Sequence, residues 1–212
     1  VQGLLSFEVP RENLVQLGVQ AEVIDGVGYI AIPSFGSPVL EDIQGNCEEF
    51  VSSGVKNLII DLRGNVEGNF EEAIHAAELF ISGGLLATLK SKDEEVAYTA
   101  NDFAFEFDGI QVLCDESTGR AAEVFALAMA GRDEAEVIGR NTLGIGTVQK
   151  DLRMEDGAFL RISYATILGP EGEELNGNGV EPDVEVEQTT DEDDTTDRIL
   201  NTALPAVGQA GK

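Results

Sequence analysis

The sequence predicts an α/β fold with one layered core, and three observations support this prediction. The chain has 212 residues, which is enough to bury a single good hydrophobic core. Its apolar content of 42%, together with 24 glycines, suits a compact α/β domain. Short apolar runs typical of buried strands also alternate with segments whose apolar residues recur at helical spacing. One domain therefore accounts for the sequence.

Two strands and two helices are predicted in the first half of the chain. Residues 28–32 alternate between two faces, which predicts a strand, and Pro33 should end its pairing because proline has no N–H. Residues 40–51 have apolar side chains at helical spacing and lead into an apolar strand at 58–60. Residues 70–81 have a second apolar helical face with glutamates on the outer side.

The second half of the chain continues this alternation. Residues 110–113 form an apolar run that predicts a strand, and a short turn leads from it into a predicted helix at 121–130. Residues 159–164 predict a late strand. Four consecutive acids at 191–194 indicate a solvated linker before a short terminal helix at 196–204.

The chain is strongly acidic, with 40 Asp and Glu against 13 Lys and Arg and a formal net charge of −27. No basic patch interrupts the acids, so nucleic acid and anionic membrane surfaces are poor partners. The charge suits a highly solvated surface, while an acid-rich or salty habitat and a cationic partner stay open as alternatives. No apolar run approaches the length of a membrane span, and no signal segment opens the chain.

Metal, cofactor and disulfide chemistry find little support in the sequence. Cys114 ends an apolar run and Cys47 lies on a predicted helix, so we expect both to be free and packed rather than joined. The only histidine, His75, has no second ligand or nucleophile beside it, and we expect it at the surface or in packing. The acids at 191–194 lack the glycine and ligand spacing of a calcium loop. We expect no cofactor and no metal.

Five blocks of the sequence, in order along the chain, carry a family resemblance. They are residues 28–35 (Gly-Tyr-Ile-Ala-Ile-Pro-Ser-Phe), 57–63 ending in Asp-Leu-Arg, 112–124 ending in Gly-Arg-Ala-Ala-Glu-Val, 142–149 (Thr-Leu-Gly-Ile-Gly-Thr-Val-Gln) and 170–183 ending in Glu-Pro-Asp. In these motifs the chain resembles the C-terminal processing, or tail-specific, serine peptidases. The resemblance implies a crotonase-like superhelix of ββα units and an extracytoplasmic location.

The departures from the family pattern fall at the positions that carry the chemistry. The resemblance places the nucleophilic serine at Arg120, whose guanidinium stays protonated and cannot attack a carbonyl. The family's lysine base is replaced by Ile145, which has no titratable group. Its Asn-Pro-Gly-Gly turn, which helps to form the oxyanion hole, is Asn-Val-Glu-Gly at residues 65–68. Glu67 would oppose a developing negative charge, and it stands at a glycine position.

A relocated dyad is the alternative to a lost one. Ser117 lies three residues before the nucleophile position, and we expect it in the strand-to-helix turn as a helix cap. Lys150 follows Gln149, and because strand side chains alternate it should point away from the face of Ile145 and Gln149. Gln149 and Glu123 are retained parts of the family site whose two working members are missing.

Arg120 also needs an anion, because it adds positive charge at the start of a helix, where the helix dipole is already positive. Glu67 or Glu123 could supply that anion within the chain, and we favour such an internal pair. The alternative is that Arg120 captures the terminal carboxylate of a peptide, together with the backbone around Gly68 and Gly119. A peptide or protein C-terminus is then the expected partner.

The resemblance also bears on the order of domains. Residues 1–20 contain a segment, 5–12, that resembles the last strand of a preceding PDZ domain. Residues 21–190 are expected to form the peptidase-like core, and residues 191–212 an acidic linker with a short C-terminal helix. We expect the natural parent to carry that PDZ domain and an export signal upstream.

Three functional hypotheses follow. The first is a non-catalytic homologue of the tail-specific peptidases that serves as a peptide-binding or assembly module. The second is an active serine endopeptidase with a relocated dyad, and the third is a scaffold whose groove has closed. The lost dyad and the altered oxyanion turn favour the first and third over the second.

Overall fold

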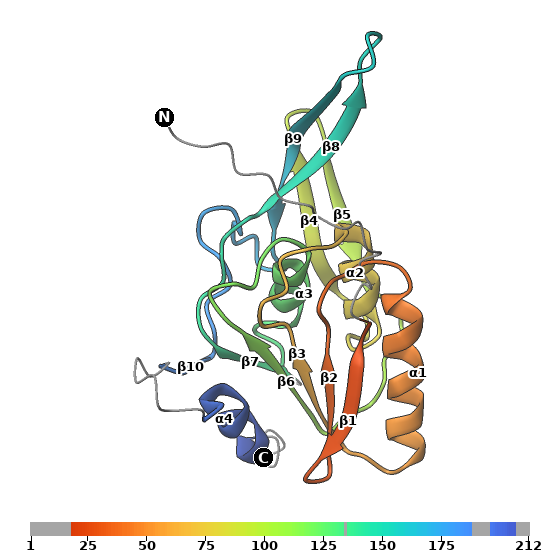
Figure 1. Cartoon of the computed structure of the whole chain (residues 1–212), viewed down its shortest axis with the longest axis vertical. Coiled ribbons are helices and arrows are strands. Elements are labelled where there is room, and N and C mark those ends of the chain that lie inside the picture. Colours follow the sequence, from red (N-terminus) through yellow and green to blue (C-terminus); the bar gives the residue numbers. More distant parts are fainter. Residues whose placement is uncertain (1–17, 134, 188–195, 207–212) are drawn as a thin grey trace, which may run out of the picture.

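The computed structural model describes residues 18–133, 135–187 and 196–206, and two β-sheets form its frame (Figure 1). The larger sheet has the strand order β1-β2-β3-β6-β7-β10. Neighbouring strands of this sheet run parallel to each other, except that β1 and β2 form an antiparallel pair. The strands are β1 (Gln20–Ile24), β2 (Val27–Ala31), β3 (Asn57–Asp61), β6 (Gly109–Cys114), β7 (Ala135–Gly139) and β10 (Val184–Glu185).

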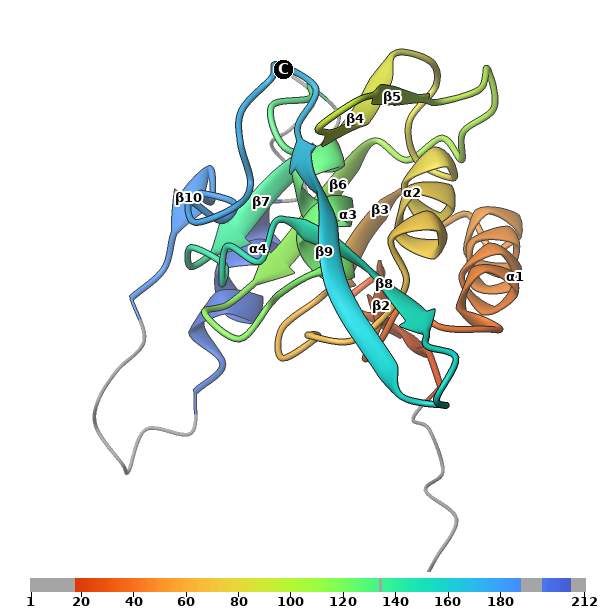
Figure 2. The same cartoon turned by 90° about the horizontal axis from the view of Figure 1, so that it is seen from above.

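Helices cover both faces of the larger sheet (Figures 1 and 2). They are α1 (Val39–Ser52), α2 (Phe70–Glu78) and α3 (Ala121–Met129) on one face and α4 (Arg198–Ala206) on the other. Alternating strand side chains feed the two cores: Leu58 and Ile60 pack beneath α1 to α3, whereas Ile59 packs in a second cluster with Ile199 of α4. Both faces of β3 are therefore buried, as is usual for a parallel strand.

The second sheet is antiparallel, with the strand order β5-β4-β9-β8, and its strand β4 packs against α3. Its strands are β4 (Leu85–Ser91), β5 (Glu95–Thr99), β8 (Thr147–Arg153) and β9 (Phe159–Leu168). Every residue of α3 is buried, because the helix lies between the two sheets. Strands β8 and β9 form a hairpin that extends away from the rest of the molecule (top of Figure 1).

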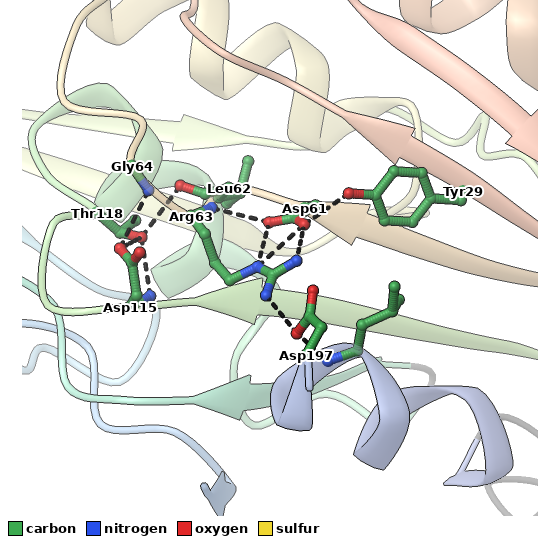
Figure 3. A network of polar contacts seen from close by, with 9 residues as sticks. Tyr29, Asp61, Leu62, Arg63, Gly64, Asp115, Thr118 and Asp197 are labelled. Carbon is green, nitrogen blue, oxygen red and sulfur yellow. Dashed lines mark hydrogen bonds and ion pairs between the residues drawn. The ribbon is translucent and has the colours of Figure 1, made fainter. Parts of the chain in front are cut away.

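A polar network joins α4 to the larger sheet (Figure 3). Arg63, just after β3, approaches Asp61 with two nitrogens, Nε at 2.9 Å from Oδ1 and Nη2 at 2.5 Å from Oδ2. Its Nη1 lies 2.7 Å from Oδ1 of Asp197, which also accepts the N–H of Leu200 in α4. Tyr29 donates its hydroxyl to Asp61 at 2.7 Å.

Burial and ion pairing shift the pKa values of Arg63 and Asp197 in opposite directions. Burial would lower the pKa of Arg63, but the hydrogen bonds to Asp61 and Asp197 outweigh it and raise that pKa. Burial would raise the pKa of Asp197, but Arg63 and the backbone N–H groups of α4 outweigh it and lower that pKa. The pKa of Tyr29 is raised by burial and by its hydrogen bond to Asp61. The pair Arg63–Asp197 is thus ionised at neutral pH.

The predicted α/β class is confirmed, and most predicted elements appear near their expected bounds. The helix expected at 70–81 ends earlier, at Glu78, and the late strand expected at 159–164 continues to Leu168. The sequence did not predict β1, β4, β5 or β7. Strands β1 and β5 are largely exposed, so no buried apolar run marks them.

Cys47 and Cys114 are free and buried, as predicted. Burial raises the pKa of both thiols, that of Cys47 to about 12, so neither is a thiolate at neutral pH. His75 is exposed on α2, also as predicted. In the described ranges no group of side chains could hold a metal ion, and no helix is long and apolar enough to cross a membrane. The predicted linker at 191–194 and the PDZ-like segment at 5–12 lie outside the described residues.

Candidate functional site

A cavity of about 510 Å³ lies where α3 begins. Its walls come from the turn before α2, from the start of α3, and from β8, β9 and the segment that leads into β8. Glu67 and Gly68 come from the first, Arg120 from the second, and Ile145 and Gln149 from the third. The fold therefore brings together the altered catalytic positions, which are far apart in the sequence.

Arg120 is the N-cap residue of α3 and has an unusual backbone conformation, with φ 56° and ψ −115°. A positive φ is unfavourable for a residue with a Cβ atom, so the surroundings must hold this geometry. The N–H of Arg120 donates to Oε2 of Glu123 at 2.8 Å. Before it, the Asp115 carboxylate accepts from the N–H of Ser117. It also accepts from the hydroxyl of Thr118, which helps to shape the turn that leaves β6 (Figure 3).

The side chain of Arg120 is exposed on the wall of the cavity. The expected internal ion pair with Glu67 or Glu123 is wrong, because no carboxylate of the described residues lies within ion-pair distance of Arg120. Glu123 is fully buried beneath the turn, and its contact with Arg120 is a hydrogen bond from the backbone N–H and not from the guanidinium. Glu67 lines the same cavity but does not pair with the guanidinium.

Glu123 fixes the wall opposite the start of α3. Its carboxylate accepts hydrogen bonds from the hydroxyl of Thr142 at 2.6 Å and from the N–H groups of Gly144 at 2.5 Å and Ile145 at 2.9 Å. With the bond from Arg120, one buried carboxylate satisfies four donors. Because its charge is compensated in this way, Glu123 is a structural centre that sets the position of Ile145 relative to Arg120.

The turn at residues 65–68 is held by backbone contacts. The Asn65 side chain donates to the carbonyl of Ile32 at 2.8 Å, and the Phe35 N–H donates to the carbonyl of Glu67 at 3.1 Å. Gly68 has φ 141°, and a Cβ atom there would lie 2.7 Å from backbone atoms of Phe35. Glu67 has no positive φ, so its side chain is accommodated without strain and extends to the cavity.

In the described part of the chain, the lining of the cavity contains neither residue of a serine–lysine dyad. Among the described residues that line it there is no serine, cysteine, histidine or lysine. Its non-phenolic hydroxyl belongs to Thr147, which has no base beside it and lies 3.5 Å from the hydroxyl of Ser163. Ile145, at the base position, contributes only an apolar surface.

The residues considered for a relocated dyad lie outside the cavity lining. Ser117 is exposed in the turn, as predicted, but it is not the helix cap, because that position belongs to Arg120. Lys150 stands opposite Ile162 and its Nζ lies 5.1 Å from the centre of the Tyr164 ring. Gly119 is also outside the lining, and its N–H donates to the carbonyl of Asn65 at 2.8 Å.

Most residues of the lining were not predicted from the sequence. Glu71, Asp151 and Arg161 add charges to it, and Phe70 and Tyr98 add an edge-to-face aromatic pair with ring centres 5.0 Å apart. Arg161 is paired with Asp151 across the hairpin at 2.7 Å. Because side chains alternate along a strand, the sequence of β8 could have predicted that Asp151 lies on the same face as Gln149. The aromatic pair could not be predicted, because it depends on the approach of β5 to α2, which no local pattern indicates.

The sequence and fold were compared with known proteins. A proteolytic enzyme from Staphylococcus aureus, described as a "Probable CtpA-like serine protease", is 30% identical over 209 residues. That match covers 97% of this chain and 42% of the relative, so the chain spans about two fifths of the curated relatives it matches. A relative of the same description from Staphylococcus epidermidis is 30% identical and covers 85% of this chain and 38% of its own length.

Solved structures have the same fold at lower identity. The photosystem II D1 C-terminal processing protease superposes with a TM-score of 0.77 at 23% identity, over 95% of this chain and 55% of the other. A lipoprotein from Streptococcus agalactiae superposes with a TM-score of 0.70 at 17% identity, over 91% and 70%. The model of peptidase family S41 matches residues 26–186, most of the described chain. The chain therefore belongs to peptidase family S41.

Proposed function

We propose that this chain is a non-catalytic member of its family and that the cavity at the start of α3 binds a peptide. The observation that carries the proposal is the lining of the cavity, in which Arg120 and Ile145 stand where the family has its nucleophile and base. An arginine is protonated at any physiological pH, and isoleucine cannot accept a proton. Neither half of a serine–lysine dyad can therefore operate.

Three features of the cavity support a binding role rather than a purely structural one. The strained backbone of Arg120 still presents a side chain to the cavity, and such a conformation costs about 1–3 kcal/mol. Glu123 still holds the opposite wall with its four hydrogen bonds. A cavity of about 510 Å³ is also within the range of small-ligand sites, which argues against a groove that has closed.

The active-enzyme alternative has little support from the geometry. Ser117 is on the surface turn and Lys150 stacks on Tyr164, so the two do not form a pair facing the cavity. Covalent catalysis needs the nucleophile and its base within hydrogen-bond reach of each other. Thr147 has no such base beside it.

A fluorophosphonate probe tests this proposal directly, followed by a binding screen. The chain should show no covalent adduct by intact mass after prolonged incubation, because no activated serine is present. It should bind members of a library of unstructured peptides in fluorescence anisotropy, with competition by unlabelled peptide. Stoichiometric labelling of Ser117 or another serine would support the active-enzyme reading, and a complete lack of peptide binding would support the scaffold reading.

A further inference from the structure

We infer that the β8–β9 hairpin is an interaction surface for a second copy of this chain, and that two hairpins pack through their apolar faces around a two-fold axis. The inference goes beyond peptide binding, because the contact is made by the outer part of the hairpin and not by the cavity. It follows from the side chains that the hairpin exposes, from its charge and from its position in the molecule.

One face of the hairpin is apolar and exposed. The register places Leu152 opposite Leu160, and residues that are opposite each other in an antiparallel pair share a face. Because side chains alternate along each strand, Ile162 lies on this face as well, and Met154 continues it at the turn. Leu152 is 38% exposed, Leu160 46% and Met154 49%. These four side chains form the apolar hairpin face.

The other face of the hairpin is occupied by contacts within the hairpin. Arg161 pairs with Asp151 at 2.7 Å, and the guanidinium of Arg153 lies 5.8 Å from the centre of the Phe159 ring. A strand pair with one polar and one apolar face is typical of a sheet that is solvated on one side and covered on the other. The pattern therefore predicts that a partner covers the apolar hairpin face.

The charge of the chain decides which partner is favoured. Residues 147–168 contain three basic and three acidic residues and are electrically neutral, although the whole chain has a net charge of −27. A cationic protein is therefore attracted to the rest of the molecule, whereas a second copy meets the least repulsion at the hairpin. A lipid surface is a poorer partner, because Glu155 and Asp156 lie in the turn that would enter it.

The shape of the molecule lowers the repulsion between two copies further. The hairpin extends away from the rest of the molecule, and its residues are exposed from Gln149 to Arg153 (top of Figure 1). At about 3.4 Å per residue, this part of β8 is about 17 Å long. Two antiparallel hairpins that overlap over this length keep the acidic parts of the two copies farther apart than the Debye length of about 8 Å at physiological ionic strength.

The charged residues at the two ends of the apolar hairpin face can complement each other between copies. Lys150 stands opposite Ile162 at the end nearer the rest of the molecule, and Glu155 lies in the turn. Neither residue forms an ion pair within the described part of the chain, and the Lys150 Nζ lies 5.1 Å from the centre of the Tyr164 ring. A two-fold interface uses the same patch on both copies. Antiparallel hairpins therefore bring Lys150 of each copy toward Glu155 of the partner subunit.

Sedimentation velocity tests the inference on the chain and on variants of the apolar hairpin face. The wild type should pass from monomer to dimer between about 1 and about 500 µM, because an interface of small area is weak. The double variant Leu152→Ser and Leu160→Ser should raise the dissociation constant of the dimer about tenfold or more, because it removes apolar area from the interface. The control is Val23→Ser with Val51→Ser, which removes two exposed apolar side chains elsewhere and should keep the dimer. Circular dichroism checks that each variant is folded.

Charge reversal tests the two-fold arrangement. Lys150→Glu and Glu155→Lys should each weaken the dimer, because each variant brings like charges together at both ends of the interface. Glu155→Lys should do so even though it lowers the net negative charge of the chain. An equimolar mixture of the two variants should form dimers again, because one copy then presents two lysines and the other two glutamates. Such a recovery cannot arise within a single chain.

Each part of the inference can be overturned separately. A wild type that stays monomeric over the whole concentration range contradicts self-association through the hairpin. A dimer that the double serine variant leaves intact uses another surface, and a mixture that stays monomeric rules out the two-fold arrangement. A monomer that sediments with phosphatidylcholine vesicles, and no longer does so in the double serine variant, would make the face a lipid contact instead. Fluorescence anisotropy reports peptide binding on the same samples, so failure of the dimer and failure of the proposed function are distinguishable.

Discussion

Arg120 keeps a backbone conformation that its own side chain makes unfavourable. The conformation places its N–H on Glu123 and its side chain toward the cavity, and the turn from Asp115 to Thr118 determines the approach. This geometry presents a guanidinium that has no ion-pair partner among the described residues.

A glycine at this position should relieve the strain. We expect Arg120→Gly to be more stable than Arg120→Ala by a few tenths to about 1 kcal/mol, because glycine adopts positive φ readily while its extra chain entropy offsets part of the gain. The measurement is urea unfolding followed by circular dichroism, with equal slopes required for the comparison. A matched Gly→Ala change at Gly45, in an ordinary helical position, should have the opposite sign. An alanine variant as stable as the glycine variant would show that φ relaxes when the arginine is removed.

Among the helices and strands, α4 depends most on side chains of other elements to hold its position. It packs on the larger sheet through Ile199 and Ala203, and Asp197 just before it pairs with Arg63. Arg63 is in turn fixed by Asp61, the last residue of β3, and the chain continues from this strand into the turn at residues 65–68. The acid that begins α4 is thus tied to the segment that leads to the cavity (Figure 3).

Docking of α4 should depend on the charge of Asp197. The pKa of Asp197 is lowered in the folded chain, so its stabilising effect is complete above the ordinary aspartate pKa of about 4 and is lost as the pH falls through the folded value. Asp197 is 41% exposed, so we expect only a few tenths of a kcal/mol to about 1 kcal/mol from the pair.

Amide hydrogen exchange of α4 measures this effect in the wild type and in Asp197→Asn. At pH 7 the variant should exchange faster in α4, by less than about tenfold, with α1 unchanged as the internal control. The difference between the two proteins should shrink below about pH 4, once exchange is corrected for its intrinsic pH dependence. A difference that stays constant across this range would assign the effect of the substitution to lost capping rather than to charge.

For the whole molecule, the dominant physical feature is its charge. The chain has 40 acidic residues and a net charge of −27, and five ion pairs within 4 Å join residues that the structure describes. Most carboxylates are therefore left to water and counterions, and they repel one another in the compact state. Beneath this surface, α3 lies in a largely apolar core that also holds the buried Glu123. Burial of apolar side chains therefore stabilises the fold, and charge repulsion at the surface opposes it.

Salt should therefore stabilise the fold. Raising sodium chloride from about 0.02 to about 0.3 M shortens the Debye length from roughly 20 to under 10 Å, and the thermal midpoint should rise by several degrees over this range. Differential scanning calorimetry measures the midpoint, and an equal osmolality of sucrose serves as the control for effects without charge. A midpoint that falls with added chloride would mean that the few ion pairs outweigh the repulsion.

Much of the fold, and the unusual residues at positions 120 and 145, could be predicted from local sequence alone. The strand at residues 58–60 and the helix at residues 40–51 are marked by periodic apolar side chains, which is a local property. The absence of a serine at Arg120 and of a base at Ile145 is a matter of side-chain chemistry, and no packing can supply what these groups lack. The family resemblance also placed both residues at one site.

Only the tertiary structure decided how the remaining groups are used. The sequence favoured a pair between Arg120 and either Glu67 or Glu123, and neither pair forms. The buried Glu123 carboxylate accepts instead from Thr142, Gly144 and Ile145 and from the backbone N–H of Arg120, and the N–H of Gly119 is taken by Asn65. These outcomes depend on distances of a few ångströms between segments that lie far apart along the chain. Composition and periodicity specify which side chains are present and which face of a helix or strand each of them occupies. The packing of the whole molecule decides which charged groups pair with each other.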